Sequence, residues 1–380
     1  MDDAIRLYRR AFRSWPELDS VQKDGLPVAV RAAAKAAGID CGEAPMEAAP
    51  APRFPVAETE QWLAYLEEHG YCVLAGVADA EEVARARALL WDFLESVPDT
   101  KVRHDDASTW VVEAGWLPSP SNGLLNKVGF GHSAFCWQTR LLPKVKQSFA
   151  AIWGTGDLIV SFDGGNVFRP WAQKPEWRTE GSWWHIDQNA FLPGRDRRVS
   201  VQGLVTYTDA TPETGGLCVV PGSHKQHREV CERMHSQKLP GDFVPVLEED
   251  PVLEEGGRLV CARAGDLLLW DSRCVHCNTP GFGPQPATPS DEGSPGAPPA
   301  SAEELEVLRA VGYVCMTPAA WASNEVLAAR RNAFVGNAGT GHLPHELQGV
   351  EPAPPWLPPN SWSCADDAKR QLVGGALASE

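Results

Sequence analysis

The sequence predicts a mainly β protein, a sandwich or barrel with flanking helices. The chain of 380 residues contains 34 glycines and 32 prolines, which favours short strands and many turns over a helix bundle. Beyond residue 150 it consists of short apolar runs bounded by turn residues. The runs are LIVSF at 158–162, WWHID at 183–187, SVQGLVTYT at 200–208, GGLCVVP at 215–221, RLVCAR at 258–263, GDLLLWD at 265–271 and RAVGYVCMT at 309–317. Their spacing is typical of a sandwich or barrel.

The part before these runs predicts mainly helices. Residues 1–42 predict a helical N-terminal arm, and residues 43–55, with four prolines, predict a linker. TEQWLAYLEEH then predicts a helix closed by Gly70, and YCVLAGV a short buried strand. DAEEVARARALLWDFLES predicts a helix opened by Asp79, because aspartate caps helix N-termini. We therefore expect the main domain to span residues 56–344.

Two later segments are rich in proline and lack apolar periodicity. Residues 281–304 contain many Pro, Gly and Ser residues and predict a disordered surface insertion between two strands. Residues 345–380 predict a proline-rich tail that lies on the surface in extended form.

Charge and composition exclude several classes of function. The net charge of −16 disfavours nucleic acid as a partner, because phosphate binding needs clustered Lys and Arg. No run of about 18 apolar residues predicts a membrane span, and MDDAIRLYRR has no apolar core of a secretory signal. The 10 cysteines are mostly scattered singly, which indicates reduced thiols and a cytoplasmic location.

The motif His185-Ile186-Asp187 is the strongest chemical signal. In a strand, residues i and i+2 project to the same face, so the imidazole and the carboxylate stand side by side. A short His-x-Asp string is weak alone, but His276 is expected at the end of the strongly apolar strand in GDLLLWDSRCVH, where its ring can reach inward. Two histidines and one carboxylate form the facial triad of non-haem iron(II) oxygenases, which leaves positions open for co-substrate and oxygen. His224, in a Pro-Gly turn, is a weaker candidate for the third ligand.

Three segments carry a resemblance to a known family. WWHIDQ, TDATPETGGLCVVPGSH and GDLLLWDSRCVHCNTP resemble the iron(II)- and 2-oxoglutarate-dependent phytanoyl-CoA dioxygenase family, and the similarity covers roughly residues 56–320. The resemblance implies a double-stranded β-helix, the jelly-roll core of cupin-like proteins, with His185, Asp187 and His276 as ligands of iron(II). It also implies 2-oxoglutarate and O2 as co-substrates and hydroxylation of a small organic substrate, with release of succinate and carbon dioxide.

The resemblance further implies an arginine that binds the far carboxylate of 2-oxoglutarate. A guanidinium suits this task because it makes two parallel hydrogen bonds to a carboxylate. Arg309 is the matching position, although it follows His276 at a longer distance than the family pattern; an insertion that loops out at 281–304 accounts for the difference. Arg273 is the alternative.

Other residues near these motifs are candidates for binding. Gln202 and, less so, Tyr207 are expected to line the co-substrate pocket. Candidate substrate contacts are Trp183, Trp184, Gln188 and Asn189 beside the metal motif, and Asp163, Asn166 and Arg169 in SFDGGNVFRP. Cys274 and Cys277 form an isolated CxxC without a second ligand pair for zinc.

Two functions remain open from sequence. The first is the 2-oxoglutarate-dependent dioxygenase, and the second is a cupin-like metal-binding protein without 2-oxoglutarate turnover, such as a sensor or scaffold. For the enzyme, the scarcity of basic clusters favours a free small molecule over an acyl-CoA, although Arg195, Arg197 and Arg198 could form a local phosphate site.

Overall fold

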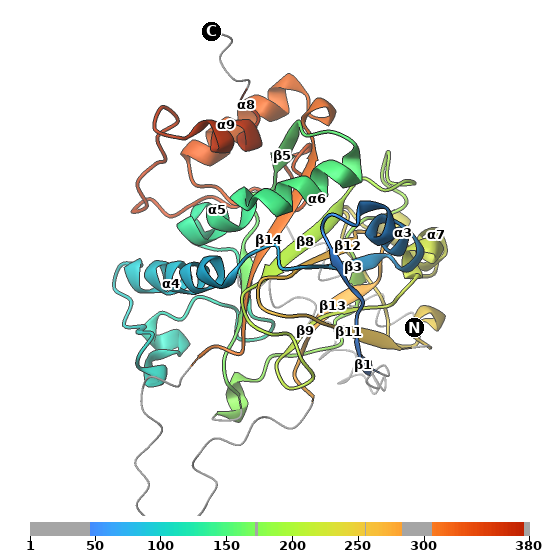
Figure 1. Cartoon of the computed structure of the whole chain (residues 1–380), viewed down its shortest axis with the longest axis horizontal. Coiled ribbons are helices and arrows are strands. Elements are labelled where there is room, and N and C mark those ends of the chain that lie inside the picture. Colours follow the sequence, from blue (N-terminus) through green and yellow to red (C-terminus); the bar gives the residue numbers. More distant parts are fainter. Residues whose placement is uncertain (1–45, 172–173, 255, 283–305, 376–380) are drawn as a thin grey trace, which may run out of the picture.

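Two β-sheets form the centre of the computed structural model, which describes residues 46–171, 174–254, 256–282 and 306–375 (Figure 1). The helical arm expected at 1–42 lies outside the described residues, and so does nearly all of the insertion expected at 281–304.

The smaller sheet has the strand order β1-β11-β9-β13-β7-β10. Its strands are β1 (Met46–Pro50), β7 (His185–Ile186), β9 (Gly215–Val219), β10 (Val244–Pro245), β11 (Gly257–Cys261) and β13 (His276–Pro280). All pairings are antiparallel except β1 with β11.

The larger sheet has the order β2-β3-β12-β8-β14-β6-β4, and β5 pairs with β14 beside this path. Its strands are β2 (Arg53–Pro55), β3 (Tyr71–Ala75), β4 (Leu124–Leu125), β5 (Leu158–Val160), β6 (Gly165–Phe168), β8 (Val201–Thr206), β12 (Leu267–Asp271) and β14 (Arg309–Pro318).

The chain passes repeatedly from one sheet to the other. It runs through β8 in the larger sheet, β9 and β11 in the smaller, β12 in the larger, β13 in the smaller and β14 in the larger. This alternation is the winding of a double-stranded β-helix. The predicted jelly-roll fold class is therefore confirmed.

Helices cover the larger sheet. They are α3 (Thr59–His69), α4 (Ala80–Ser96), α5 (Ala134–Leu141), α6 (Pro143–Trp153), α8 (Asn324–Val335) and α9 (Asp367–Val373). The short helix α7 (His227–Arg233) instead packs in an apolar cluster with residues of the smaller sheet, such as Ile186 and Cys218. Figure 1 shows α5 and α6 crossing over β14, which they contact, while α3 packs on β3 and β12. None of the described helices is long and apolar enough to cross a membrane.

Local signals place the first two of these helices where the sequence predicts them. Gly70 ends α3 with a φ of 77°, in the left-handed region that glycine adopts without strain. Asp79 caps α4, and its side chain accepts from the Glu82 N–H while the Glu82 side chain accepts from the Asp79 N–H.

The alternation of side chains along the larger sheet separates two apolar layers. Val201, Val205 and Val314 belong to the layer shared with the helices. Leu204 and Val311 point the other way, into the layer between the sheets. Polar residues that lie an even number of positions from Leu204 or Val311 on the same strand therefore also face the interior between the two sheets.

Three expectations about elements are wrong. The linker expected at 43–55 contains β1 and β2, each at the edge of a sheet. The tail expected to be extended contains α9, whose Leu372 and Val373 are buried. His276 does not end the apolar strand before it: β12 ends at Asp271, and after a tight turn His276 opens β13 in the other sheet.

Candidate active site

Three potential metal ligands meet where β7 and β13 lie side by side. His185 opens β7, Asp187 follows that strand directly, and His276 is the antiparallel partner of His185. One ligand atom of each lies within 4.8 Å of the others. Nε2 of His185 and Nε2 of His276 lie 3.5 and 3.3 Å from Oδ2 of Asp187. The donor set of two imidazoles and one carboxylate fits a facial iron(II) site.

Backbone carbonyls fix the orientation of both imidazoles. Nδ1 of His185 lies 3.0 Å from the carbonyl oxygen of Trp183, and Nδ1 of His276 lies 2.9 Å from that of Cys274. Because a carbonyl oxygen can only accept, each Nδ1 carries the proton and each Nε2 presents its lone pair to the site. The ring of His185 also stacks against Trp183 and Phe243, with ring centroids 4.8 and 4.9 Å away.

The site favours the protonation states that bind metals. Gln202 on β8 donates from Nε2 to Oδ2 of Asp187 at 2.8 Å. Burial raises the pKa of Asp187, but the neighbouring His185 and His342 outweigh burial and hold this pKa well below its usual value. Burial, helped by His185, lowers the pKa of His276. An ionised carboxylate and a neutral imidazole are the forms that a metal requires.

A buried arginine without a counter-ion lies in the same interior. Arg309 opens β14 and is 1% exposed. Its Nε donates to Oδ1 of Asn166 at 3.0 Å and its Nη2 to Oδ1 of Asn278 at 3.2 Å. Its Nη1 has no hydrogen-bond partner, and within the described residues no carboxylate forms an ion pair with it. Burial lowers the pKa of this guanidinium.

The strands place this guanidinium on the interior side that the three potential ligands also face. Asn278 lies two residues after His276 on β13, and Tyr313 lies four residues after Arg309 on β14, so each pair shares one face of its strand. Nδ2 of Asn278 donates to Tyr313 Oη at 3.1 Å. A Cβ atom on Gly216 would stand 2.9 Å from Nη1 of Arg309, so the glycine leaves room for the guanidinium.

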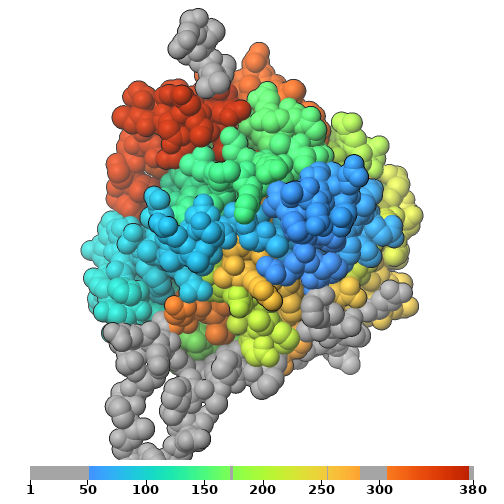
Figure 2. All heavy atoms as spheres, in the orientation of Figure 1, coloured from blue at the N-terminus to red at the C-terminus, as the bar shows by residue number. Residues whose placement is uncertain are grey.

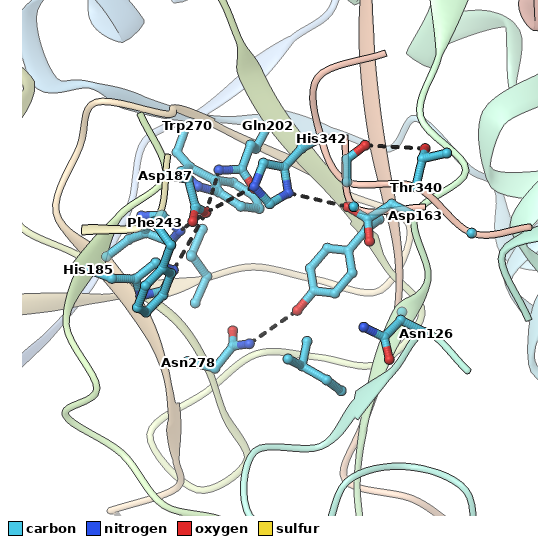
Figure 3. A pocket seen from close by; sticks show the side chains of 18 of the residues that line it. Asn126, Asp163, His185, Asp187, Gln202, Phe243, Trp270, Asn278, Thr340 and His342 are labelled. Carbon is cyan, nitrogen blue, oxygen red and sulfur yellow. Dashed lines mark hydrogen bonds and ion pairs between the residues drawn. The ribbon is translucent and has the colours of Figure 1, made fainter. Parts of the chain in front are cut away.

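A pocket of about 290 Å³ is lined by the three potential metal ligands. Figure 3 shows His185, Asp187 and Phe243 on one side, with Asp163, Thr340 and Asn126 across from them and His342 between. Its carboxylates are Asp163, Asp187 and Glu351, and no lysine or arginine is among the described residues that line it.

The C-terminal part contributes a wall that sequence reasoning missed. Gly339, Thr340, Gly341, His342, Gly349 and Glu351 line the pocket. Burial lowers the pKa of His342, but Asp187 and Asp163 outweigh burial and raise this pKa to about 9. Figure 2 shows the red C-terminal residues beside the green helices α5 and α6. No spacing motif links these residues to the HxD motif, so the sequence held no signal for them.

Two predicted substrate residues face away from the pocket. Trp184 is 1% exposed and packs in a separate apolar cluster, against Gly257. Gln188 is buried and donates to the carbonyls of Arg195 and Arg197. Trp183, in contrast, lines the pocket together with His185 and Asp187. The alternation of a strand explains the difference, and this signal was present in the sequence.

One of the other three candidates, Gln202, lies in the pocket, and two, Asn166 and Tyr207, lie outside it. Asn166 lies in β6 and accepts a hydrogen bond from Arg309 instead of lining the pocket. Gln202 lines the pocket and binds Asp187. The Tyr207 hydroxyl is paired with Thr139 outside the pocket.

The remaining alternatives lie elsewhere. Nε2 of His224 forms a hydrogen bond with the carbonyl oxygen of Glu67. The guanidinium of Arg273 donates to Asp271. Arg169 donates to the carbonyl of Trp110, and Asn189 to those of Ser236 and Gly241. Cys274 is buried and belongs to no metal-ligand cluster in the described part of the chain.

Comparison with known proteins gives one family match and several relatives. The model of the phytanoyl-CoA dioxygenase (PhyH) family matches residues 66–280. Ava biosynthesis cluster protein O of Aspergillus versicolor is 28% identical over 251 residues, which cover 63% of this chain and 72% of that protein. Ectoine dioxygenase of Stutzerimonas stutzeri is 26% identical over 223 residues, which cover 55% of this chain and 68% of that protein.

Solved structures with a similar arrangement are more distant. EctD from S. alaskensis with 2-oxoglutarate and 5-hydroxyectoine has a TM-score of 0.43 at 16% identity, over 81% of this chain and 85% of that chain. The epimerase SnoN, in complex with Fe3+, alpha ketoglutarate and nogalamycin RO, has a TM-score of 0.41 at 18% identity, over 69% of this chain and 84% of that chain.

Proposed function

The chain belongs to the phytanoyl-CoA dioxygenase family, whose members are 2-oxoglutarate-dependent non-haem iron dioxygenases, and on that premise we propose that it hydroxylates a free small organic molecule. One observation carries the proposal: a two-histidine, one-carboxylate donor set and a buried arginine face the same interior, and no counter-ion of this arginine is found among the described residues. We infer that His185, Asp187 and His276 hold iron(II).

The bound iron would supply the activation of O2, coupled to the oxidative decarboxylation of 2-oxoglutarate to succinate and carbon dioxide. The chain's own residues orient the ligands. The carbonyls of Trp183 and Cys274 hold the two imidazoles, and Gln202 holds Asp187. We therefore assign Gln202 to the support of the metal ligand, whereas the sequence suggested a contact with the co-substrate.

Arg309 is the proposed partner of the far carboxylate of 2-oxoglutarate. A buried cation is costly unless it is paired, and within the described residues the groups against this one are neutral: the amides of Asn166 and Asn278 accept from it, and the ring of Phe168 lies against it. Its Nη1 retains a free donor, and Gly216 leaves space beside it. The same unpaired guanidinium favours the enzyme over a metal-binding protein without 2-oxoglutarate turnover, because such a protein would have no anion to place there.

A free small molecule fits the pocket better than an acyl-CoA. Two of the three arginines that could bind coenzyme A phosphates are already held in ion pairs: Arg195 pairs with Asp242 and Glu346, and Arg198 pairs with Asp271 and Glu67. The third, Arg197, is exposed and would have to bind the phosphates without them. Arginines held in ion pairs are poor phosphate ligands, because binding would have to break the existing pairs.

The test is an anaerobic titration of the purified protein with iron(II) and then 2-oxoglutarate, followed by admission of air. We expect the weak visible charge-transfer band of the chelate and then slow formation of succinate in the absence of substrate. Addition of a small-molecule substrate should raise the rate of succinate formation, and an acyl-CoA should not. Iron binding without either band or succinate would refute the proposed activity and support the metal-binding alternative.

A further inference from the structure

We propose that His342 positions the metal ligand Asp187, and that the C-terminal segment 339–351 thereby takes part in setting the geometry of the metal site. The inference rests on the metal site proposed above. His342 lies outside the residues that the family model matches, so nothing in that match assigns it a role.

The ring of His342 bridges two carboxylates. Its Nε2 lies 3.6 Å from Oδ2 of Asp187, and its Nδ1 lies 3.6 Å from Oδ2 of Asp163 (Figure 3). Both distances are within reach of an ion pair and slightly longer than a hydrogen bond. The same Oδ2 of Asp187 faces the Nε2 atoms of the two metal-binding histidines and accepts from Gln202. His342 thus contacts the oxygen that faces the metal position.

His342 acts beside the metal and not as a fourth ligand. It is absent from the group whose ligand atoms all lie within 4.8 Å of one another. Two nitrogens bound to one ion at about 2.1 Å are at most about 4.2 Å apart. The ring would have to move to join the ligand set, whereas its contact with Asp187 needs little adjustment.

The backbone that carries His342 is fixed from several directions. Ser200 Oγ donates to the His342 carbonyl at 3.0 Å, two residues before Gln202. The Phe162 N–H donates to Thr340 Oγ1 at 2.9 Å, and the Thr340 N–H donates to the Phe162 carbonyl at 3.2 Å. The start of β8 therefore supports both side chains that hold Asp187.

The two ends of the segment are also joined to each other. Gly339 and Glu351 exchange backbone hydrogen bonds at 2.9 and 3.0 Å, and the Gly341 N–H donates to the Gln348 carbonyl at 2.8 Å. A side chain on so constrained a backbone can hold a partner in one position, which is the requirement for supporting a metal ligand.

Binding of Co(II) to the metal-free protein tests the inference without the need for a substrate. His342→Phe keeps the ring volume and removes both nitrogens, and His342→Gln restores a donor. His345→Gln is the control, because His345 lies in the same segment but contacts Thr317 and Trp321 and not the metal ligands. Co(II) affinity and the visible absorption of bound Co(II) are measured for each variant.

We expect His342→Phe to bind Co(II) about 10-fold more weakly or worse, the usual effect of losing a group that supports a metal ligand. Its visible bands should shift, His342→Gln should recover part of the affinity, and His345→Gln should match the wild type. Unchanged affinity and spectrum in His342→Phe would overturn the inference, as would an equal loss in His345→Gln. A wild type that binds no Co(II) would instead refute the metal site itself.

Discussion

Replacement of Arg309 by methionine should weaken 2-oxoglutarate binding strongly and change the stability of the metal-free protein little. Leaving one partner of a buried charge pair alone costs about 2–5 kcal/mol, or roughly 30-fold to several thousand-fold in the dissociation constant. In the metal-free protein Arg309 has only two hydrogen bonds, to Asn166 and Asn278. Each contributes about 1 kcal/mol, and removal of an unpaired buried charge offsets the loss, so we expect a change within about 1 kcal/mol.

Arg330 provides a matched control. It is as buried as Arg309, but it donates four hydrogen bonds, to the carbonyls of Val373, Pro344, Val160 and Leu372. Arg330→Met should therefore lower the free energy of unfolding by about 3 kcal/mol or more, because several buried carbonyls lose their partner. The assays are the anaerobic 2-oxoglutarate titration and urea unfolding of the metal-free protein. Unchanged 2-oxoglutarate affinity in Arg309→Met, or a loss of stability as large as in Arg330→Met, would refute the reasoning.

Three further changes test other parts of the site and fold. His185→Ala should abolish iron binding and succinate formation together, because it removes a metal ligand; near-normal turnover would contradict the assignment. Gly216→Ala should weaken 2-oxoglutarate binding and spare Co(II) binding, since the new Cβ would stand 2.9 Å from Arg309 Nη1; equal losses of both would point to misfolding. Burial raises the pKa of Asp271, but Arg273 and Arg198 outweigh burial and lower it to about 2. Asp271→Asn should therefore cost about 2 kcal/mol at pH 7. Because the folded-state pKa is depressed, this difference is present above about pH 4 and disappears as the pH falls towards 2; urea unfolding that shows a constant difference over this range would refute it.

The strands of the core could be predicted because buried strands consist mainly of apolar residues. β8, β12 and β14 are apolar runs bounded by turn residues, and each lies within two residues of its predicted range. β13 could not be recognised, because HCNTP carries no apolar pattern and becomes a strand only between β9 and β7. The prolines around β1 and β2 misled the prediction, since proline is tolerated at the edge of a sheet.

The same distinction applies to the candidate site: contacts within one strand could be predicted from the sequence, and contacts between distant segments could not. The HxD motif is local, so its geometry followed from the alternation of a strand. The same rule, applied to Trp183 and Trp184, would have placed the first in the pocket and the second behind it. His342 reaches Asp187 only through the folding of a distant segment, and no pattern in the sequence anticipates that contact.

The pairing of His185 with His276 also has a consequence for the order in which the protein assembles. The two residues are about ninety positions apart in the chain, yet they are direct neighbours across β7 and β13. Closing a loop of that length has an entropic cost, which the pairing of the smaller sheet must meet before the imidazoles can share an ion. We therefore expect iron to bind after the smaller sheet has paired. Once bound, the ion joins two distant points of the chain and, by binding only the folded state, shifts the equilibrium away from the unfolded chain.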